Sequence, residues 1–211
     1  MLGAVVVASG ITTAIVLSGS DNDRVRTSPA ATQPTAAAAI VSGAAQQLQT
    51  LLQHAQASTY HATYSVAGDA KALGGVQTID VWHAPPNVRE DTALTSGTTT
   101  VRTETLSDGQ TGQACRQTTG AWTCTPLSAA EAAQAGGFAT QIIASLAGGQ
   151  VAVSTETISG SPAQCFAVAA GAKVCVDAHG IPVLIADADV RYERTALETK
   201  IESGAFTPPT G

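Results

Sequence analysis

Charged and aromatic side chains are scarce in this chain of 211 residues. Charged residues make up 12% and aromatic residues 4%, whereas hydrophobic residues make up 44%. The 16 acidic residues outnumber the 10 basic residues, so the formal net charge is -6. Because phosphate backbones repel an acidic protein, we expect no nucleic-acid partner. So apolar a composition also excludes a disordered polyelectrolyte and predicts one globular domain with additional segments.

The sequence signatures of common catalytic sites are missing as well. The chain has no G-x-S-x-G elbow, no P-loop and no G-x-G-x-x-G loop, so hydrolase and nucleotide-binding functions lack a starting residue. The spacings H-x-x-x-H and H-E-x-x-H are absent among the four histidines, which are His54, His61, His83 and His179. We therefore expect no enzyme, no metal site and no cofactor, and a hydrolase is the weakest of the hypotheses.

The N-terminal segment is the longest uncharged stretch. Residues 2–19 carry no charged side chain, and this length is close to the roughly 20 residues of a transmembrane helix. It equally fits the apolar core of a cleaved secretory signal, so both alternatives stay open for residues 1–19. Residues 20–35 are polar and contain two prolines, which predicts a flexible linker. We expect the folded domain over residues 36–206 and a disordered tail over residues 207–211.

Cysteine spacing indicates the compartment. The four cysteines are Cys115, Cys124, Cys165 and Cys175. Their spacing does not match the C-x-x-C pairs of zinc and redox sites, and each close pair brackets a turn-like segment. We therefore expect two hairpin disulfides, Cys115–Cys124 and Cys165–Cys175. In the second hairpin, Phe166 would then lie opposite Val174 and face the core. Disulfides persist in oxidising surroundings, which predicts an extracytoplasmic domain.

Hydrophobic periodicity predicts the element order. Apolar residues recur at helical spacing over residues 36–58, and S-x-x-E at Ser128 and Glu131 predicts a capping box that opens a helical region over residues 127–147. Alternating patterns separated by turn residues predict strands over residues 60–66, 76–83, 87–93, 98–106, 110–117, 121–125, 151–158, 163–169, 172–176, 181–186 and 190–195. We therefore expect an α+β fold built on an antiparallel sheet.

Three stretches of sequence resemble a known family. They are VWHAPPNVRED over residues 81–91, SDGQ over residues 107–110 and VCVDAHGIPVLIADADVRY over residues 174–192. In this element order they resemble the LolA-like lipoprotein-carrier fold, and more closely its extracytoplasmic LppX- and LprG-type members. The resemblance implies a strongly curved antiparallel sheet, an incomplete β-barrel, with helices across its concave face. Between sheet and helices it implies an apolar cavity that accepts acyl chains or lipidated molecules.

Large apolar residues on the central helix and on the strands are the candidates for the wall of this cavity. They are Val66, Val81, Phe138, Ile142, Leu146, Val153, Phe166 and Val168. The same residues would also be buried in an ordinary core, so both interpretations stay open.

Two functions follow from the resemblance. The first is an extracytoplasmic carrier whose partners are a lipid or lipidated molecule and, through residues 2–19, the membrane. The alternative is a regulatory or structural module of the anti-sigma-factor-regulator type, which binds a protein partner and has no ligand. No cysteine lies near the end of the uncharged segment 2–19, where the lipid-anchored relatives carry the cysteine that accepts the lipid.

Overall fold

The structure is a computed structural model of the whole chain. It describes residues 36–68, 76–135, 151–167, 172–186 and 190–209. All of them belong to one compact unit, Pro34–Gly211.

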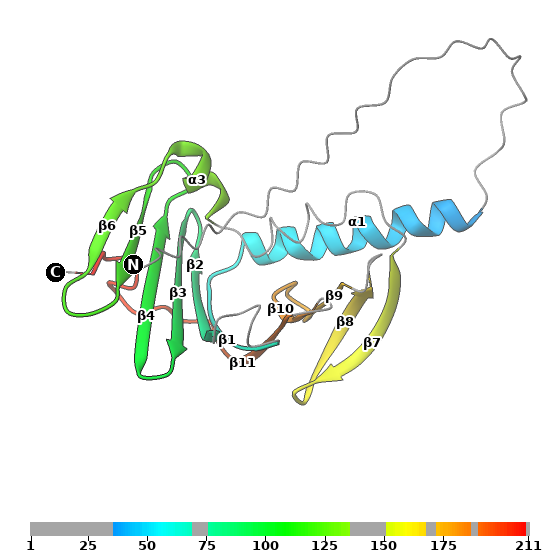
Figure 1. Cartoon of the computed structure of the whole chain (residues 1–211). Helices are drawn as coiled ribbons and strands as arrows, with labels where there is room; N and C mark the ends of the chain where they lie inside the picture. Colours follow the sequence, from blue (N-terminus) through cyan, green and yellow to red (C-terminus); the bar gives the residue numbers. More distant parts are fainter. Residues whose placement is uncertain (1–35, 69–75, 136–150, 168–171, 187–189, 210–211) are drawn as a thin grey trace, which may run out of the picture. The chain divides into compact units, whose positions relative to one another are not determined.

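Eleven strands form a single antiparallel sheet in the order β6-β5-β4-β3-β2-β1-β11-β10-β9-β8-β7 (Figure 1). The strands are β1 Tyr60–Gly68, β2 Val76–Ala84, β3 Asn87–Ser96, β4 Thr99–Ser107, β5 Gly112–Gln117, β6 Thr123–Pro126, β7 Ala152–Ile158, β8 Ser161–Ala167, β9 Lys173–Val176, β10 Pro182–Ala186 and β11 Val190–Glu198. Strands that follow each other in sequence pair as hairpins, except β6 and β7, which form the two edges of the sheet. Strand β1 joins the two halves because it pairs with both β2 and β11. The whole sheet is therefore a meander that is continued by one long-range pairing.

The predicted α+β class is wrong. Strands dominate the part of the chain that the structure describes, which holds two helices, α1 Ala36–Gln56 and α3 Ala129–Gln134. The sheet is open and not closed into a barrel. Most of the described chain follows the two-residue alternation of strands, so the sheet outweighs the helices. Within the predicted helical region 127–147, Ala129–Gln134 is a helix, and residues 136–147 lie outside the described residues.

The fold prediction also included a transmembrane or signal helix at the N-terminus. Residues 2–19 lie outside the described residues. Within the described ranges, neither helix is both long enough and apolar enough to cross a bilayer.

Helix α1 packs on one face of the sheet, which we call the inner face. Its apolar stripe includes Leu48 and Leu52, both 0% exposed, which pack against Phe166 of β8 and the valines of β9. The end of the helix packs through Ala55 against a second cluster around Tyr64 of β1. The prediction of a helix with one apolar stripe is confirmed. By order of magnitude, each such leucine contributes about 2 kcal/mol through burial.

The turn between β9 and β10 approaches α1 closely. Gly180 has a φ of +78°, and a Cβ there would lie 1.7 Å from the carbonyl oxygen of Leu51. Only glycine fits this position, because it combines a left-handed backbone with a backbone contact. The contact fixes α1 against the β9–β10 end of the inner face.

Helix α3 begins with the predicted capping box. The Ser128 side chain accepts a hydrogen bond from the backbone N–H of Glu131, and the Glu131 carboxylate accepts one from the backbone N–H of Ser128. The hydroxyl of Ser107, at the end of β4, donates to the carbonyl of Ala132 at 2.7 Å. This short helix is thereby held against the β4–β5 hairpin.

Both predicted disulfides are present, and each joins directly opposed residues of one hairpin. Cys115 of β5 pairs with Cys124 of β6, and Cys165 of β8 pairs with Cys175 of β9. The predicted register of the second hairpin is confirmed, since Phe166 lies opposite Val174. Both disulfides lie on the opposite side of the sheet from α1, which we call the outer face.

Candidate functional site

The inner face carries a continuous row of apolar side chains across six neighbouring strands. Residues that lie directly opposite each other in antiparallel strands point to the same face. The pairings β7–β8, β8–β9, β9–β10, β10–β11 and β11–β1 therefore place one residue of each strand in line. We call these residues the inner row: Val153, Phe166, Val174, Ile185, Tyr192 and Val66.

Burial changes along the inner row. Phe166 and Val174 are buried beneath α1. Ile185, Tyr192 and Val66 are half-buried: Ile185 packs against the same cluster as Leu48, and Tyr192 and Val66 pack against the cluster around Tyr64. At the other end, on the edge strand β7, Val153 is 44% exposed and is the one large exposed hydrophobic residue of the described part of the chain. The apolar surface thus extends past the helix that covers its middle.

The eight predicted cavity residues fall into different environments. Phe138, Ile142, Leu146 and Val168 lie outside the described residues. Val66, Val153 and Phe166 are members of the inner row. Val81 of β2 is buried in the cluster around Tyr64.

Exposure differs among the predicted cavity residues that the structure describes. Phe166 is buried in the cluster with Leu48, and Val81 is buried in the cluster around Tyr64. For Val66 and Val153, partial exposure leaves room for contact with a ligand.

A buried ion pair lies at the β1–β11 end of the inner face. Arg194 of β11 donates to the Asp177 carboxylate at 2.7 Å, and both side chains are largely buried. The same carboxylate accepts hydrogen bonds from the backbone N–H groups of His179 and Ile181. Asp177 therefore holds the β9–β10 turn in place, and its partners satisfy its charge.

Two tyrosines beside this ion pair are kept neutral by their surroundings. Burial, and next the Asp177 carboxylate, raise the pKa of Tyr60 to about 12, against a smaller lowering by Arg194. Burial also raises the pKa of Tyr64, whose hydroxyl donates to the Pro182 carbonyl at 3.1 Å. Both hydroxyls therefore stay protonated near neutral pH, so neither phenol is a base there.

One more ionisable group faces the inner side. Glu90 of β3 lies opposite Val81, and burial, and next the charge of Asp91, raise the pKa of Glu90. Within the described ranges, only Glu156, Cys165 and Cys175 form a group with metal-ligand spacing, and the two cysteines are joined as a disulfide.

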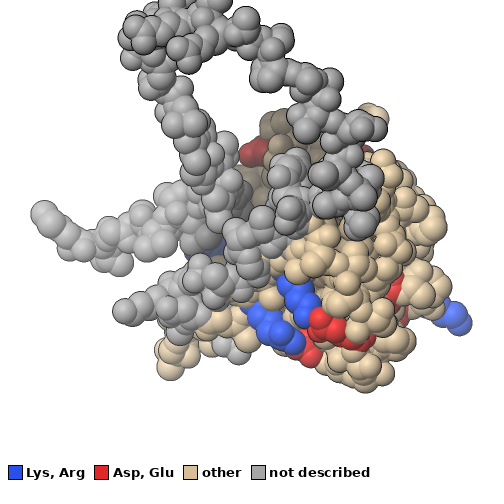
Figure 2. Space-filling model, turned by 90° about the vertical axis from the view of Figure 1, so that its right-hand side faces the viewer, with Lys and Arg blue, Asp and Glu red and all other residues tan. Residues whose placement is uncertain are grey.

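Surface charges form pairs of opposite sign. Lys173 contacts Glu156 at 2.6 Å, and Arg191 contacts Glu193 at 2.7 Å. Figure 2 shows basic side chains next to acidic ones on the face that it displays.

The chain was compared with known proteins. No protein-family model matches it, and the search of curated proteins finds no match. Among solved structures, the lipoprotein LppX of Mycobacterium tuberculosis is 14% identical with a TM-score of 0.47, over 76% of this chain and 98% of LppX.

Two further solved structures are similar. MucB, crystallised in complex with MucA(peri), is 18% identical with a TM-score of 0.46, over 76% of this chain and 57% of the MucB chain. LprF of Mycobacterium bovis is 12% identical with a TM-score of 0.44, over 79% of this chain and 98% of LprF. LppX belongs to the group that residues 81–91, 107–110 and 174–192 resemble.

Proposed function

We propose that this chain is an extracytoplasmic, non-catalytic binding protein that holds an acyl chain of a lipid or lipidated molecule against the inner face of its sheet. The observation that carries the proposal is the inner row. It is apolar over six consecutive strands, and α1 covers only its middle. With strands about 4.8 Å apart, the row is about 24 Å long. An extended hydrocarbon chain bound along all of it has to displace α1 from Phe166 and Val174.

Apolar burial alone would give useful affinity. Each buried methylene group contributes about 0.8 kcal/mol, so about ten of them would supply the roughly 8 kcal/mol of micromolar binding, before the cost of immobilising the ligand. Val153 at one end and Val66 at the other provide partly exposed surface for this contact. No catalytic group is needed for such a function.

The disulfides support the proposed location. Cys115–Cys124 and Cys165–Cys175 both require an oxidising compartment to persist. An extracytoplasmic place is also where a protein that moves lipidated molecules between membranes would meet them. The location and the ligand class are thus consistent with each other.

Val153→Asp tests the proposal in the full chain. A charge placed on the exposed end of the inner row would have to be desolvated when an acyl chain binds, so binding of a fluorescently labelled fatty acid should weaken by about tenfold or more. The matched control is Ala152→Asp, because Ala152 is the exposed neighbour on the same strand and points to the outer face. It should bind the fatty acid as the unmodified chain does.

The outcomes separate the two functions predicted from the sequence. Equal weakening by both substitutions would contradict binding along the inner row. No binding of the fatty acid by the unmodified chain would contradict the carrier function and favour the protein-binding module. Thermal unfolding of both variants, measured in parallel, shows whether a loss of binding comes from loss of the fold.

A further inference from the structure

The outer face of the β1–β6 half carries a second row of aligned side chains. Pairings β1–β2, β2–β3, β3–β4 and β4–β5 place one residue of each strand in line, and we call them the outer row: His61, Trp82, Arg89, Leu106 and Gln113. The His61 and Trp82 rings stack with centroids 4.3 Å apart. The Arg89 guanidinium lies 4.7 Å from the centroid of the Trp82 ring.

Arg89 is held in one orientation by two carboxylates. Its Nε and Nη2 atoms donate to the two oxygens of Asp91 at 2.8 and 2.6 Å. Its Nη2 also lies 2.8 Å from the carboxylate of Glu104, a side chain that is only 3% exposed. The hydrogen bond with Asp91 is the main reason that the pKa of Arg89 is raised. The Nη1 atom is thereby aimed away from the two acids.

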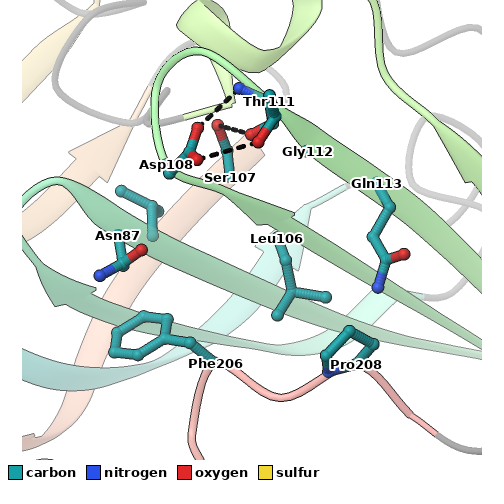
Figure 3. Close-up of a pocket in the computed structure, with 10 residues that line it drawn as sticks. Asn87, Leu106, Ser107, Asp108, Thr111, Gly112, Gln113, Phe206 and Pro208 are labelled. Atoms are coloured by element: carbon teal, nitrogen blue, oxygen red, sulfur yellow. Dashed lines mark hydrogen bonds between the residues drawn. The ribbon is translucent and has the colours of Figure 1, made fainter.

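The C-terminal residues of the described chain lie against the outer row. The Nη1 atom of Arg89 donates to the main-chain carbonyl of Ala205 at 2.8 Å. In Figure 3, Leu106 and Gln113 point toward the side of the sheet on which Phe206 and Pro208 lie, and all four residues line one pocket. This contact recognises the backbone of the segment at Ala205 and packs an apolar side chain next to it.

The segment does not fill the space beneath it. A pocket of about 490 Å³ is lined by His61, Trp82 and Arg89 together with residues 200–205. A second pocket of about 290 Å³ is lined by Leu106 and Gln113 together with Phe206. One pocket adjoins residues 200–205 and the other adjoins Phe206 and Pro208, so open space remains along the outer row beside the segment. We call this surface of the outer row the groove.

One hydrogen-bond donor in the groove is unused. The Nε2 atom of Gln113 is buried and has no hydrogen-bond partner in the part of the chain that the structure describes. A buried donor without an acceptor is costly, by the desolvation of the group. The groove therefore offers two donors, from Arg89 and Gln113, of which the C-terminal segment uses one.

We propose that the outer row is a binding groove for an extended polypeptide segment of another protein, and that the chain's own residues 199–209 occupy it in its absence. The acceptor at Arg89 is a main-chain carbonyl, which any polypeptide supplies. A better-fitting segment would place a second acceptor at Gln113 and an apolar side chain on Leu106. The groove is on the face opposite to the inner row, so this proposal is independent of acyl-chain binding.

The test uses the full chain and a dye-labelled peptide with the sequence of residues 199–209. Phe206→Asp in the full chain should release the chain's own segment, because a charged side chain cannot remain against Leu106. Fluorescence anisotropy should then show that the Phe206→Asp chain binds the peptide at least about tenfold more tightly than the unmodified chain, because the internal competitor is weakened.

Two matched variants test the groove contacts. A peptide that itself carries Phe206→Asp should not bind the Phe206→Asp chain. Adding Arg89→Lys to that chain should weaken binding by about tenfold, because lysine cannot hold Asp91 and Glu104 while donating to the carbonyl of Ala205. Arg102→Lys is the control, since Arg102 is an exposed arginine on the neighbouring strand β4.

Each result decides for or against the groove. The groove is supported if the peptide that carries Phe206→Asp does not bind and if Arg102→Lys in the chain leaves binding of the unmodified peptide unchanged. Failure of the Phe206→Asp chain to bind the unmodified peptide would overturn the proposal, and so would equal binding of both peptides. The peptide comparison decides the matter even where Arg89→Lys destabilises the fold.

Discussion

The side chains on the two faces of this sheet have different surroundings and different roles. On the inner face, Tyr60 and Tyr64 lie beside the buried Arg194–Asp177 pair, and their hydroxyls remain protonated. On the outer face, the acids around Arg89 orient its guanidinium toward a backbone carbonyl. The first group stabilises the interior, and the second presents a donor at the surface.

Tyr60 makes the stability of the protein depend on alkaline pH. Its pKa is about 12 in the folded chain, above the usual 10, so the folded state retains a proton that the unfolded state loses. The stabilisation of the folded state by Tyr60 is complete below pH 10. It is lost as the pH rises toward 12, by up to about 1.4 kcal/mol per pH unit. Tyr64 acts in the same direction.

Urea unfolding between pH 9 and pH 11 measures this dependence. We expect Tyr60→Phe to reduce the loss of unfolding free energy with pH, because phenylalanine cannot ionise in the unfolded chain. An identical pH dependence in Tyr60→Phe and in the unmodified chain would show that Tyr60 does not carry it.

The strands and the first helix were predictable from sequence to within a few residues. The alternation of apolar and polar residues in Tyr60–Gly68 marks a strand, because one face of the strand is buried. The residues Asp108 and Gly109 mark a strand end, because the turn there needs a left-handed backbone at Gly109. The cysteine spacing then fixed the register of two hairpins. The pairing of β1 with β11 was not predictable, because it joins segments more than 120 residues apart and no local pattern specifies it.

Part of the outer row could be predicted from the sequence. The turn at Pro85 and Pro86 places Trp82 opposite Arg89, so the stretch VWHAPPNVRED contained the centre of the outer row as a cross-strand pair. The position of Phe206 was not predictable, because its place in the pocket that Leu106 also lines depends on the path of the chain after β11. The sequence pattern predicts which residues lie opposite each other within a hairpin, but it does not specify where a loop places its residues.

The two disulfides should differ in their response to reductant. Cys165 and Cys175 are at most 1% exposed within a cluster that includes Ile158 and Leu184, whereas Cys124 on the edge strand β6 is exposed. Thiol–disulfide exchange requires access to a sulfur atom, so a mild reductant should open Cys115–Cys124 first.

Timed alkylation followed by peptide mass spectrometry measures the order of reduction. Alkyl groups should appear on Cys115 and Cys124 well before they appear on Cys165 and Cys175. Simultaneous labelling of all four cysteines in the native state would contradict the difference in burial.

The molecule as a whole is one open antiparallel sheet with a different surface on each side. The inner face is apolar and partly covered by α1, and the outer face of the β1–β6 half is polar and aromatic and contacts the C-terminal residues. The two rows lie on opposite faces of the sheet and share only β1, which contributes Val66 to the inner row and His61 to the outer row, so substitutions in one row should leave binding at the other unchanged. One sheet can in this way serve an apolar ligand and a polypeptide partner at once.

Native mass spectrometry of the full chain tests acyl-chain binding most directly. The chain would be purified from an extracytoplasmic fraction and also after incubation with phospholipid vesicles. We predict an additional species whose extra mass equals one acyl-chain-bearing lipid, reduced in Val153→Asp and retained in Ala152→Asp. The mass of the bare protein alone in both preparations would contradict the account.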